Sequence, residues 1–402
     1  MKRTLYALAT LLLMGGATTQ YLANAASNEA DTQPAQSTRS ADITGTWIAE
    51  FQEHKWRGVS ETLWITMRAN TKRDRHGFNF TIPLKDLDGL AISRGHNGKS
   101  SVAFQLPREA GVFAFDGQFV DDAGSGTFDF TISETYVRDM GRLGYKSLGQ
   151  DKLLQLAIHD VTTSFVKELD KLGFADLSYD DLLASAIHGL TPEYIRDIRR
   201  FGYKDITHDE FIAMRIHGVT VEYIEEMAAL GFSDLPYDEL LAARIHGVST
   251  DFVGEFQEIG FNLKSLDKLV ELRIHGVSPA YVQSFVDAGY DNAPLKEYVQ
   301  MRIHGVSEQF VETMGKLGYD NVSMDKLVEM KIHGVTSSYV SELADLGYKN
   351  IPVNKLVEMR IHGVSASFVR EVKEAGYTPR VNKLIEMRIH GVSPRMLKAT
   401  KG

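Results

Sequence analysis

The sequence predicts an α+β multidomain protein: an N-terminal antiparallel β sandwich or small barrel, followed by an α-solenoid of nine helix-turn-helix repeats of about 29 residues. Two observations predict this architecture. Apolar and polar residues alternate between residues 42 and 132, which is the period of a half-buried strand. From residue 133 onward, variants of Met-Arg-Ile-His-Gly-Val-Ser recur every 29 residues, except for a last interval of 28, and such a period indicates stacked supersecondary units.

The N-terminal residues predict export. A positively charged start at Met1–Arg3 precedes an apolar stretch at Leu5–Met14, and Ala23–Ala25 supplies small residues for cleavage. We interpret residues 1–25 as a bacterial signal peptide and expect a periplasmic or secreted protein with no transmembrane span after cleavage. Retention of this stretch as a membrane anchor is the alternative. The chain has no cysteine, so neither a disulfide nor a cysteine-linked lipid anchor is available.

Residues 26–41 are rich in Ser, Thr, Gln and Ala and lack an apolar period, which indicates a disordered linker. Residues 42–132 form the predicted β domain. Its strands are expected around Trp47, Ile65, Phe80, Phe104, Phe113 and Phe130, with turn-forming clusters between them. The pattern leaves open whether this domain holds a small molecule.

Glycines and cap residues divide residues 133–402 into short helices, which we interpret as the solenoid. In one repeat, a helix is expected to begin after Ser265 as N-cap and to stop at Gly276, where a left-handed conformation is needed. Ser278 then caps a second helix with Pro279 at its first position. Asp160 replaces the stop glycine in the first repeat, and aspartate tolerates the left-handed conformation better than most residues.

A histidine ends the first helix of every repeat. The set is His159, His188, His217, His246, His275, His304, His333, His362 and His390. We expect each imidazole to be buried or half-buried at its helix end and to bond a free backbone carbonyl. The histidines would then form a structural ladder, with binding as a further use.

A metal site is the alternative reading of some of these histidines, because Glu271 and His275 lie four residues apart on one helix face. The same spacing relates Glu329 to His333, Glu358 to His362, and Glu386 to His390. Equivalent histidines of stacked helices, about 8–10 Å apart, could not share one ion. The ladder is therefore the favoured interpretation, and no metal or other cofactor is expected.

Two further residue types recur with the histidines. A basic residue stands two positions before most of them: Arg215, Arg244, Arg273, Arg302, Lys331, Arg360 and Arg388. We expect these side chains to point outward and pair with acids on neighbouring helices. An aromatic residue recurs in the second helix at Phe165, Tyr194, Tyr223, Phe252, Tyr281, Phe310, Tyr339 and Phe368, where apolar neighbours indicate a place in the core.

Charge is unevenly distributed along the repeats. Residues 205–258 contain twelve acids and two arginines, a net charge of −10, whereas residues 349–402 contain eleven Lys and Arg and four acids, a net charge of +7. The two ends of an elongated molecule would attract different partners, and the basic end could contact an anionic envelope surface. It lacks the interleaved aromatic residues typical of nucleic-acid binding, so no nucleic acid is expected.

The β domain followed by these repeats resembles the C-terminal extension of bacterial beta-lactam-sensor (antirepressor) type membrane metallopeptidases and related stand-alone exported proteins. The residues that carry the resemblance are Met301–Ser307, Met359–Ser365 and Arg108–Gly111. The peptidase half is missing, because no His-Glu-x-x-His motif occurs. The resemblance therefore implies a shared binding or sensory architecture without protease activity.

No catalytic constellation stands out, and we do not expect an enzyme. We expect an exported scaffold of the cell envelope that binds a protein or peptide through the solenoid surface. The alternative is a metal- or ligand-sensing module that works with a separate membrane metallopeptidase or signal transducer.

Export gives a first testable prediction. The mature chain should begin at Ala26 or Ser27 and appear in the periplasm or the medium, because the small residues at Ala23–Ala25 suit signal peptidase. N-terminal sequencing after cell fractionation checks this. A full-length chain in the cytosol would contradict it.

Overall fold

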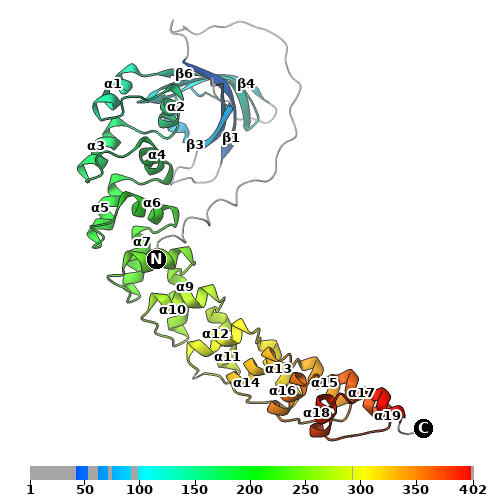
Figure 1. Ribbon diagram of the computed structural model, residues 1–402. Coiled ribbons are helices and arrows are strands. Elements are labelled where there is room, and N and C mark those ends of the chain that lie inside the picture. Colours follow the sequence, from blue (N-terminus) through cyan, green and yellow to red (C-terminus); the bar gives the residue numbers. More distant parts are fainter. Residues whose placement is uncertain (1–41, 53–61, 71–74, 92–97, 292, 400–402) are drawn as a thin grey trace.

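The computed structural model describes residues 42–52, 62–70, 75–91, 98–291 and 293–399. The predicted signal peptide and linker lie outside these residues. The described part contains a strongly curved antiparallel sheet followed by an elongated, bent row of helices (Figure 1). It therefore has the predicted α+β composition, and its helices form a repeat-like architecture.

Six strands make up the sheet. They are β1 Ile43–Gln52, β2 Thr62–Asn70, β3 Arg75–Pro83, β4 Lys99–Arg108, β5 Gly111–Val120 and β6 Ala123–Ile132. The order is β3-β2-β1-β6-β5-β4, and all neighbours are antiparallel.

The predicted sandwich or barrel is wrong, because the described strands form one open sheet with β3 and β4 at its edges. After β3 the chain passes through the short 3-10 helix η1 Leu84–Asp86 and touches β4 at a single bridge, between Asp88 and Gln105. At that bridge Asp88, and not β3, pairs with the free edge of β4.

One face of the sheet is filled by large aromatic side chains. Trp47 makes edge contacts with Phe104 and Phe115 at ring-centroid distances of 5.6 and 6.1 Å. Its indole N–H donates to the carbonyl of Thr127 at 3.0 Å, so the buried polar group is satisfied. Gly45 allows this packing, because a Cβ there would lie 2.4 Å from the ring of Phe128. The other face of β1 is exposed, as the alternation predicts.

The helices fall into an odd-numbered and an even-numbered set. The odd set is α1 Glu134–Arg142, α3 Thr163–Lys171, α5 Pro192–Arg200, α7 Val221–Ala229, α9 Thr250–Glu258, α11 Pro279–Asp287, α13 Glu308–Lys316, α15 Ser337–Asp345, α17 Ala366–Glu374 and α19 Pro394–Ala399. The even set is α2 Gln150–Ile158, α4 Tyr179–His188, α6 His208–Ile216, α8 Tyr237–Ile245, α10 Leu266–Ile274, α12 Leu295–Ile303, α14 Met324–Ile332, α16 Val353–Ile361 and α18 Val381–Ile389.

Contacts between neighbouring repeats join odd helices to odd helices and even helices to even helices. For example, α8 packs on α10, and α7 packs on α9. The helices therefore build two layers, and each described helix of about 9 residues is too short to be stable alone. Stacking supplies the stability that the single helices lack.

The predicted turn chemistry is found at most positions. Gly276 adopts φ 66°, and the amide of Val277 donates to the carbonyl of Leu272 at 2.8 Å, the bond that defines a Schellman stop. Ser278 caps α11, and Asp160 adopts φ 51° as expected. Ser265 is a correction: it precedes α10, but its side chain makes no cap hydrogen bond.

Tyrosine hydroxyls in five of the odd helices connect one repeat to the next. Each donates to the carbonyl of the residue after the left-handed stop, 25 positions further on: Tyr136 to Val161, Tyr194 to Val219, Tyr223 to Val248, Tyr281 to Val306 and Tyr339 to Val364, at 2.7–2.9 Å. These carbonyls lie beyond the helix ends and have no partner within their own helix. The tyrosines satisfy them and fix the position of one repeat against the next.

The sheet is attached to the first repeat through the turn between β4 and β5. The carboxylate of Glu109 accepts from the amide of Thr163 at 2.8 Å and from its hydroxyl at 2.6 Å, at the start of α3. Arg108 pairs with Asp160 at 3.6 Å, and α2 packs against β6. The segment Arg108–Gly111 therefore serves as the junction between sheet and helices.

The tyrosine contacts predict a loss of stability at alkaline pH. Burial raises the pKa of Tyr223, Tyr281 and Tyr339 to about 12, against the lowering effect of the nearby arginines. An unfolded tyrosine ionises near pH 10, so the unfolded chain holds fewer protons above that pH. The contribution of the neutral tyrosines should be complete below about pH 10 and should disappear as pH rises toward 12, as measured by urea unfolding.

A triple Tyr→Phe variant at these three positions is the matched control, because phenylalanine occupies the equivalent positions in other repeats, such as Phe252. It should lose about 1 kcal/mol per hydrogen bond at neutral pH and show a shallower decline between pH 10 and 12. An unchanged slope would mean that these hydroxyls do not cause the alkaline loss.

Candidate functional site

The nine predicted histidines lie at the ends of the even helices, but most of them lack the burial and the carbonyl bond that the predicted ladder requires. His159, His217 and His304 are half-buried, whereas the other six are exposed. Among the described residues, none of the nine rings donates to a backbone carbonyl. Partial burial lowers the pKa of His159, which lies nearest the sheet. The predicted burial is therefore wrong for most of the set: His188, His246, His275, His333, His362 and His390.

The glutamates of the predicted metal pairs are already engaged. The carboxylate of Glu271 binds Lys268 at 2.9 Å, and the same spacing gives Glu329–Lys326 at 2.5 Å, Glu358–Lys355 at 2.6 Å and Glu386–Lys383 at 2.8 Å. The Lys383 ammonium also lowers the pKa of Glu386. None of these pairs belongs to a cluster of three ligand-type side chains in the described part of the chain.

The basic residues were expected to pair with acids on neighbouring helices, and their contacts are a second correction. Each lies over the aromatic ring of the preceding repeat: Arg215 over Tyr194, Arg244 over Tyr223, Arg273 over Phe252, Arg302 over Tyr281, Lys331 over Phe310, Arg360 over Tyr339 and Arg388 over Phe368. The distance from the guanidinium carbon of Arg273 to the ring centroid of Phe252 is 3.7 Å. Stacking on a ring is more favourable than an exposed ion pair, because it also covers apolar surface.

Sequence reasoning missed the isoleucine before each histidine. Eight of them form what we call the isoleucine row: Ile187, Ile216, Ile245, Ile274, Ile303, Ile332, Ile361 and Ile389. Between 37% and 57% of each residue is exposed, although isoleucine belongs to the residue types most often buried. The signal in the sequence was that isoleucine recurs at this position in all eight repeats. A recurring isoleucine is equally typical of a core position, so only the structure shows that it is exposed.

In the first repeat, the isoleucine position is buried instead of exposed. Its isoleucine is Ile158, at the end of α2, and only 6% of the residue is exposed. α2 is the even helix that packs on β6, whereas the eight later isoleucines are exposed. The same position is therefore buried on an even helix that packs against the sheet, and exposed on the eight even helices that follow it.

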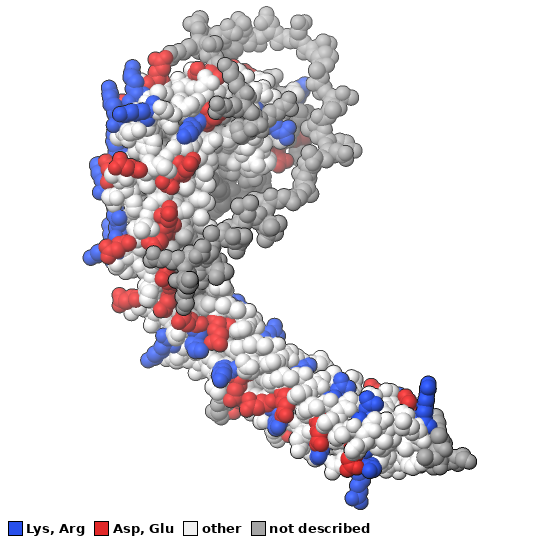
Figure 2. Space-filling model, in the orientation of Figure 1, with Lys and Arg blue, Asp and Glu red and all other residues white. Residues whose placement is uncertain are grey.

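Charge varies along the even layer beside this row. α4 carries Asp180 and Asp181 and no Lys or Arg, whereas α18 carries Lys383 and Arg388 against Glu386. Acidic side chains gather over the middle of the helical part on the face drawn in Figure 2. Clefts along the described helices have volumes that range from 330 Å³ beside Tyr145 to 480 Å³ beside Leu230. The arrangement suits an extended contact better than one enclosed ligand.

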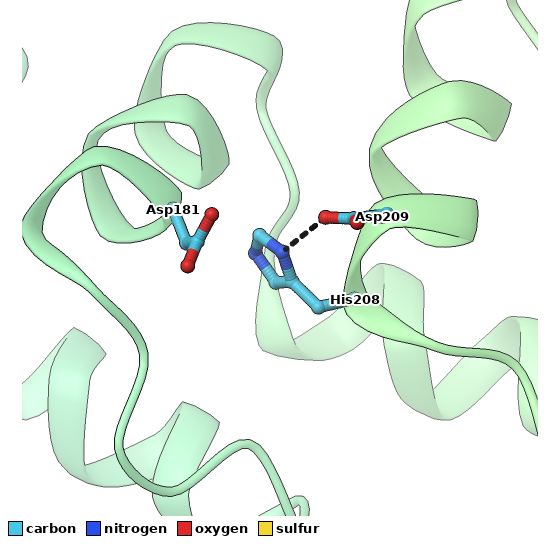
Figure 3. A group of neighbouring side chains, drawn as sticks. All are labelled: Asp181, His208 and Asp209. Carbon is cyan, nitrogen blue, oxygen red and sulfur yellow. Dashed lines mark ion pairs between the residues drawn. The ribbon is translucent and has the colours of Figure 1, made fainter.

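A second missed feature lies between α4 and α6. Asp181, His208 and Asp209 each place one ligand-type atom within 4.8 Å of the others, and Figure 3 shows the imidazole between the two carboxylates. The signal in the sequence was that His208 departs from the repeat, where the equivalent residues include Tyr179 and Tyr237.

No protein-family model matches the chain, and no curated protein matches it. None of the helices in the described part of the chain combines the length and the apolar character that crossing a bilayer requires.

The contacts predict opposite results for two neighbouring residues. Arg273→Ala should cost about 1–2 kcal/mol of unfolding free energy, because the ring of Phe252 loses its cover. His275→Ala should change it by less than about 0.5 kcal/mol, because the imidazole is exposed. Urea unfolding of both variants checks this.

Arg302→Lys is the matched control, since Lys331 already occupies the equivalent place over Phe310 at 4.4 Å. It should lose less stability than Arg302→Ala. A large loss of unfolding free energy in His275→Ala would instead support the structural histidine ladder.

Proposed function

We propose that this chain is an exported, non-catalytic scaffold of the bacterial cell envelope that binds a protein partner along the isoleucine row. The observation that carries the proposal is the exposure of the same isoleucine in eight repeats. Its N-terminal sequence pattern supports export.

The finer architecture belongs to the same proposal: nine helix-turn-helix repeats of about 29 residues stack as an α-solenoid. Two observations support it. Contacts run within the odd and the even layer from one repeat to the next, and the tyrosine hydrogen bonds recur at a constant separation of 25 residues. A solenoid presents equivalent residues of successive repeats in a line, which is what turns eight isoleucines into one surface.

Stacking alone does not require isoleucine at this position. The repeat interfaces are already filled by buried residues on either side, such as Leu272 at 2% and Val277 at 1% exposure, while Ile274 is 57% exposed. Exposed apolar side chains add no stability and increase the risk of aggregation. Their recurrence is explained if they are covered by a partner, as the sheet covers the helix that carries Ile158.

The partner that fits is an extended polypeptide. Packed helices lie about 8–10 Å apart, so an extended chain rising about 3.3 Å per residue would meet a new isoleucine every third residue. The acidic α4, where the isoleucine row begins, favours basic residues at one end of this polypeptide, and the basic α18 favours acidic residues at the other. Apolar side chains between them would cover the row.

Peptide selection tests this proposal. A random peptide library displayed on phage is selected on the wild-type chain and, separately, on a variant with Ile274→Ser, Ile303→Ser and Ile332→Ser. These side chains are 57%, 48% and 55% exposed, so the variant should keep its fold. Wild type should enrich peptides with apolar residues and opposite charges at their two ends, and the variant should bind them at least about tenfold more weakly.

A control variant carries Ala280→Ser, Gln309→Ser and Lys316→Ser on exposed positions of the odd layer, and it should bind the peptides like wild type. Peptides that bind all three proteins equally would contradict the proposal. If the wild-type chain dimerises and the isoleucine variant does not, the occupant of the row is a second copy of the chain.

A further inference from the structure

Two departures from the repeat meet each other between α4 and α6. Ser185 and His208 are hydrogen-bonded, with Oγ and Nε2 separated by 2.8 Å. The residues equivalent to Ser185 are all apolar: Leu156, Met214, Ala243, Leu272, Met301, Met330, Met359 and Met387. From the second repeat on, those equivalent to His208 are Tyr179, Tyr237, Leu266, Leu295, Met324, Val353 and Val381. A polar pair has therefore replaced a pair that is elsewhere apolar or part aromatic, and such local exceptions are expected at functional sites.

The hydrogen bonds determine which ring nitrogen carries the proton. The hydroxyl of Ser185, which is fully buried, donates to the carbonyl of Asp181 at 2.9 Å. Its oxygen is then free to accept from Nε2–H of His208, and the neutral ring keeps a lone pair on Nδ1. Metal-binding histidines are held in this way, with the second nitrogen bonded to an acceptor that orients the ring.

Nδ1 has no hydrogen-bond partner, although only 10% of the His208 side chain is exposed. It lies 3.6 Å from a carboxylate oxygen of Asp209. A lone pair that faces an anion at this distance is unfavourable unless a cation lies between them. Ligand atoms about 2.1 Å from a tetrahedral zinc ion lie about 3.4 Å apart, close to the observed separation.

The two carboxylates come from the first turns of their helices. Asp181 is held by the capping box of α4, in which one of its oxygens accepts from Ser178. Asp209 follows His208 in α6, and 94% of its side chain is exposed, so it can turn toward an ion.

We propose that Asp181, His208 and Asp209 form a binding site for a divalent transition-metal ion such as Zn²⁺, with Nδ1 of His208 as the fixed ligand. One imidazole nitrogen and two carboxylate oxygens suit zinc, whereas magnesium and calcium prefer oxygen ligands alone. Water would complete the coordination. The site is separate from the isoleucine row and does not depend on the function proposed for that row.

Calorimetric titration of the full chain, purified without a polyhistidine tag, with Zn²⁺ and separately with Mg²⁺ tests the proposal. Wild type should bind one Zn²⁺ with an affinity well above its affinity for Mg²⁺. Asp209→Asn should lower the zinc affinity at least about tenfold while leaving the metal-free melting temperature unchanged, because the residue is exposed.

Two further variants complete the test. Ser185→Ala combined with His208→Leu reproduces the pair Ala243 and Leu266 of the α8–α10 interface, so it should fold and lose the zinc site. His217→Ala removes the repeat histidine at the other end of α6, and this variant should bind zinc like wild type. The proposal is overturned if wild type has no tight zinc site, or if zinc binds the double variant and Asp209→Asn as tightly as it binds wild type.

Discussion

The aromatic ring in the odd helix of each repeat is the contact on which the helical part depends. A guanidinium or ammonium group of the next repeat covers one ring after another, from Arg215 over Tyr194 to Arg388 over Phe368. Where the ring is a tyrosine, its hydroxyl also reaches the carbonyl beyond the next left-handed stop. One side chain thus joins both layers of the following repeat, which fixes the separation and the rotation between repeats.

This contact leaves the helix end free for another use. Since stacking is achieved by the ring and the basic residue, the isoleucine and histidine that follow are not needed between repeats, and most of them face solvent. At α2 the sheet lies against the same helix layer, and Ile158 there is buried. A position that is buried in one repeat and exposed in eight supports the contact surface that we propose.

Departures from the repeat fall into two kinds. Asp160, in place of a stop glycine, has a structural reason, because its carboxylate pairs with Arg108 at the junction with the sheet. Ser185 and His208 have no such reason. Their hydrogen bond lies in a layer that is otherwise largely apolar, and it leaves a ring nitrogen without a partner. Polar groups that stay unpaired in the interior are costly. The proposed cation would give Nδ1 of His208 the partner that packing does not supply.

The sequence by itself determined the local structure. Strand alternation, left-handed stops such as Gly276 and Asp160, and the cap at Ser278 depend on residues near one another in the chain, and they are found as predicted. Only the tertiary structure decided which recurring residues face a neighbour. Arg273 and His275 stand two positions apart and recur together, yet one stacks on Phe252 and the other is exposed. Periodicity identifies positions that are equivalent, whereas burial depends on what the next repeat and the sheet place against them.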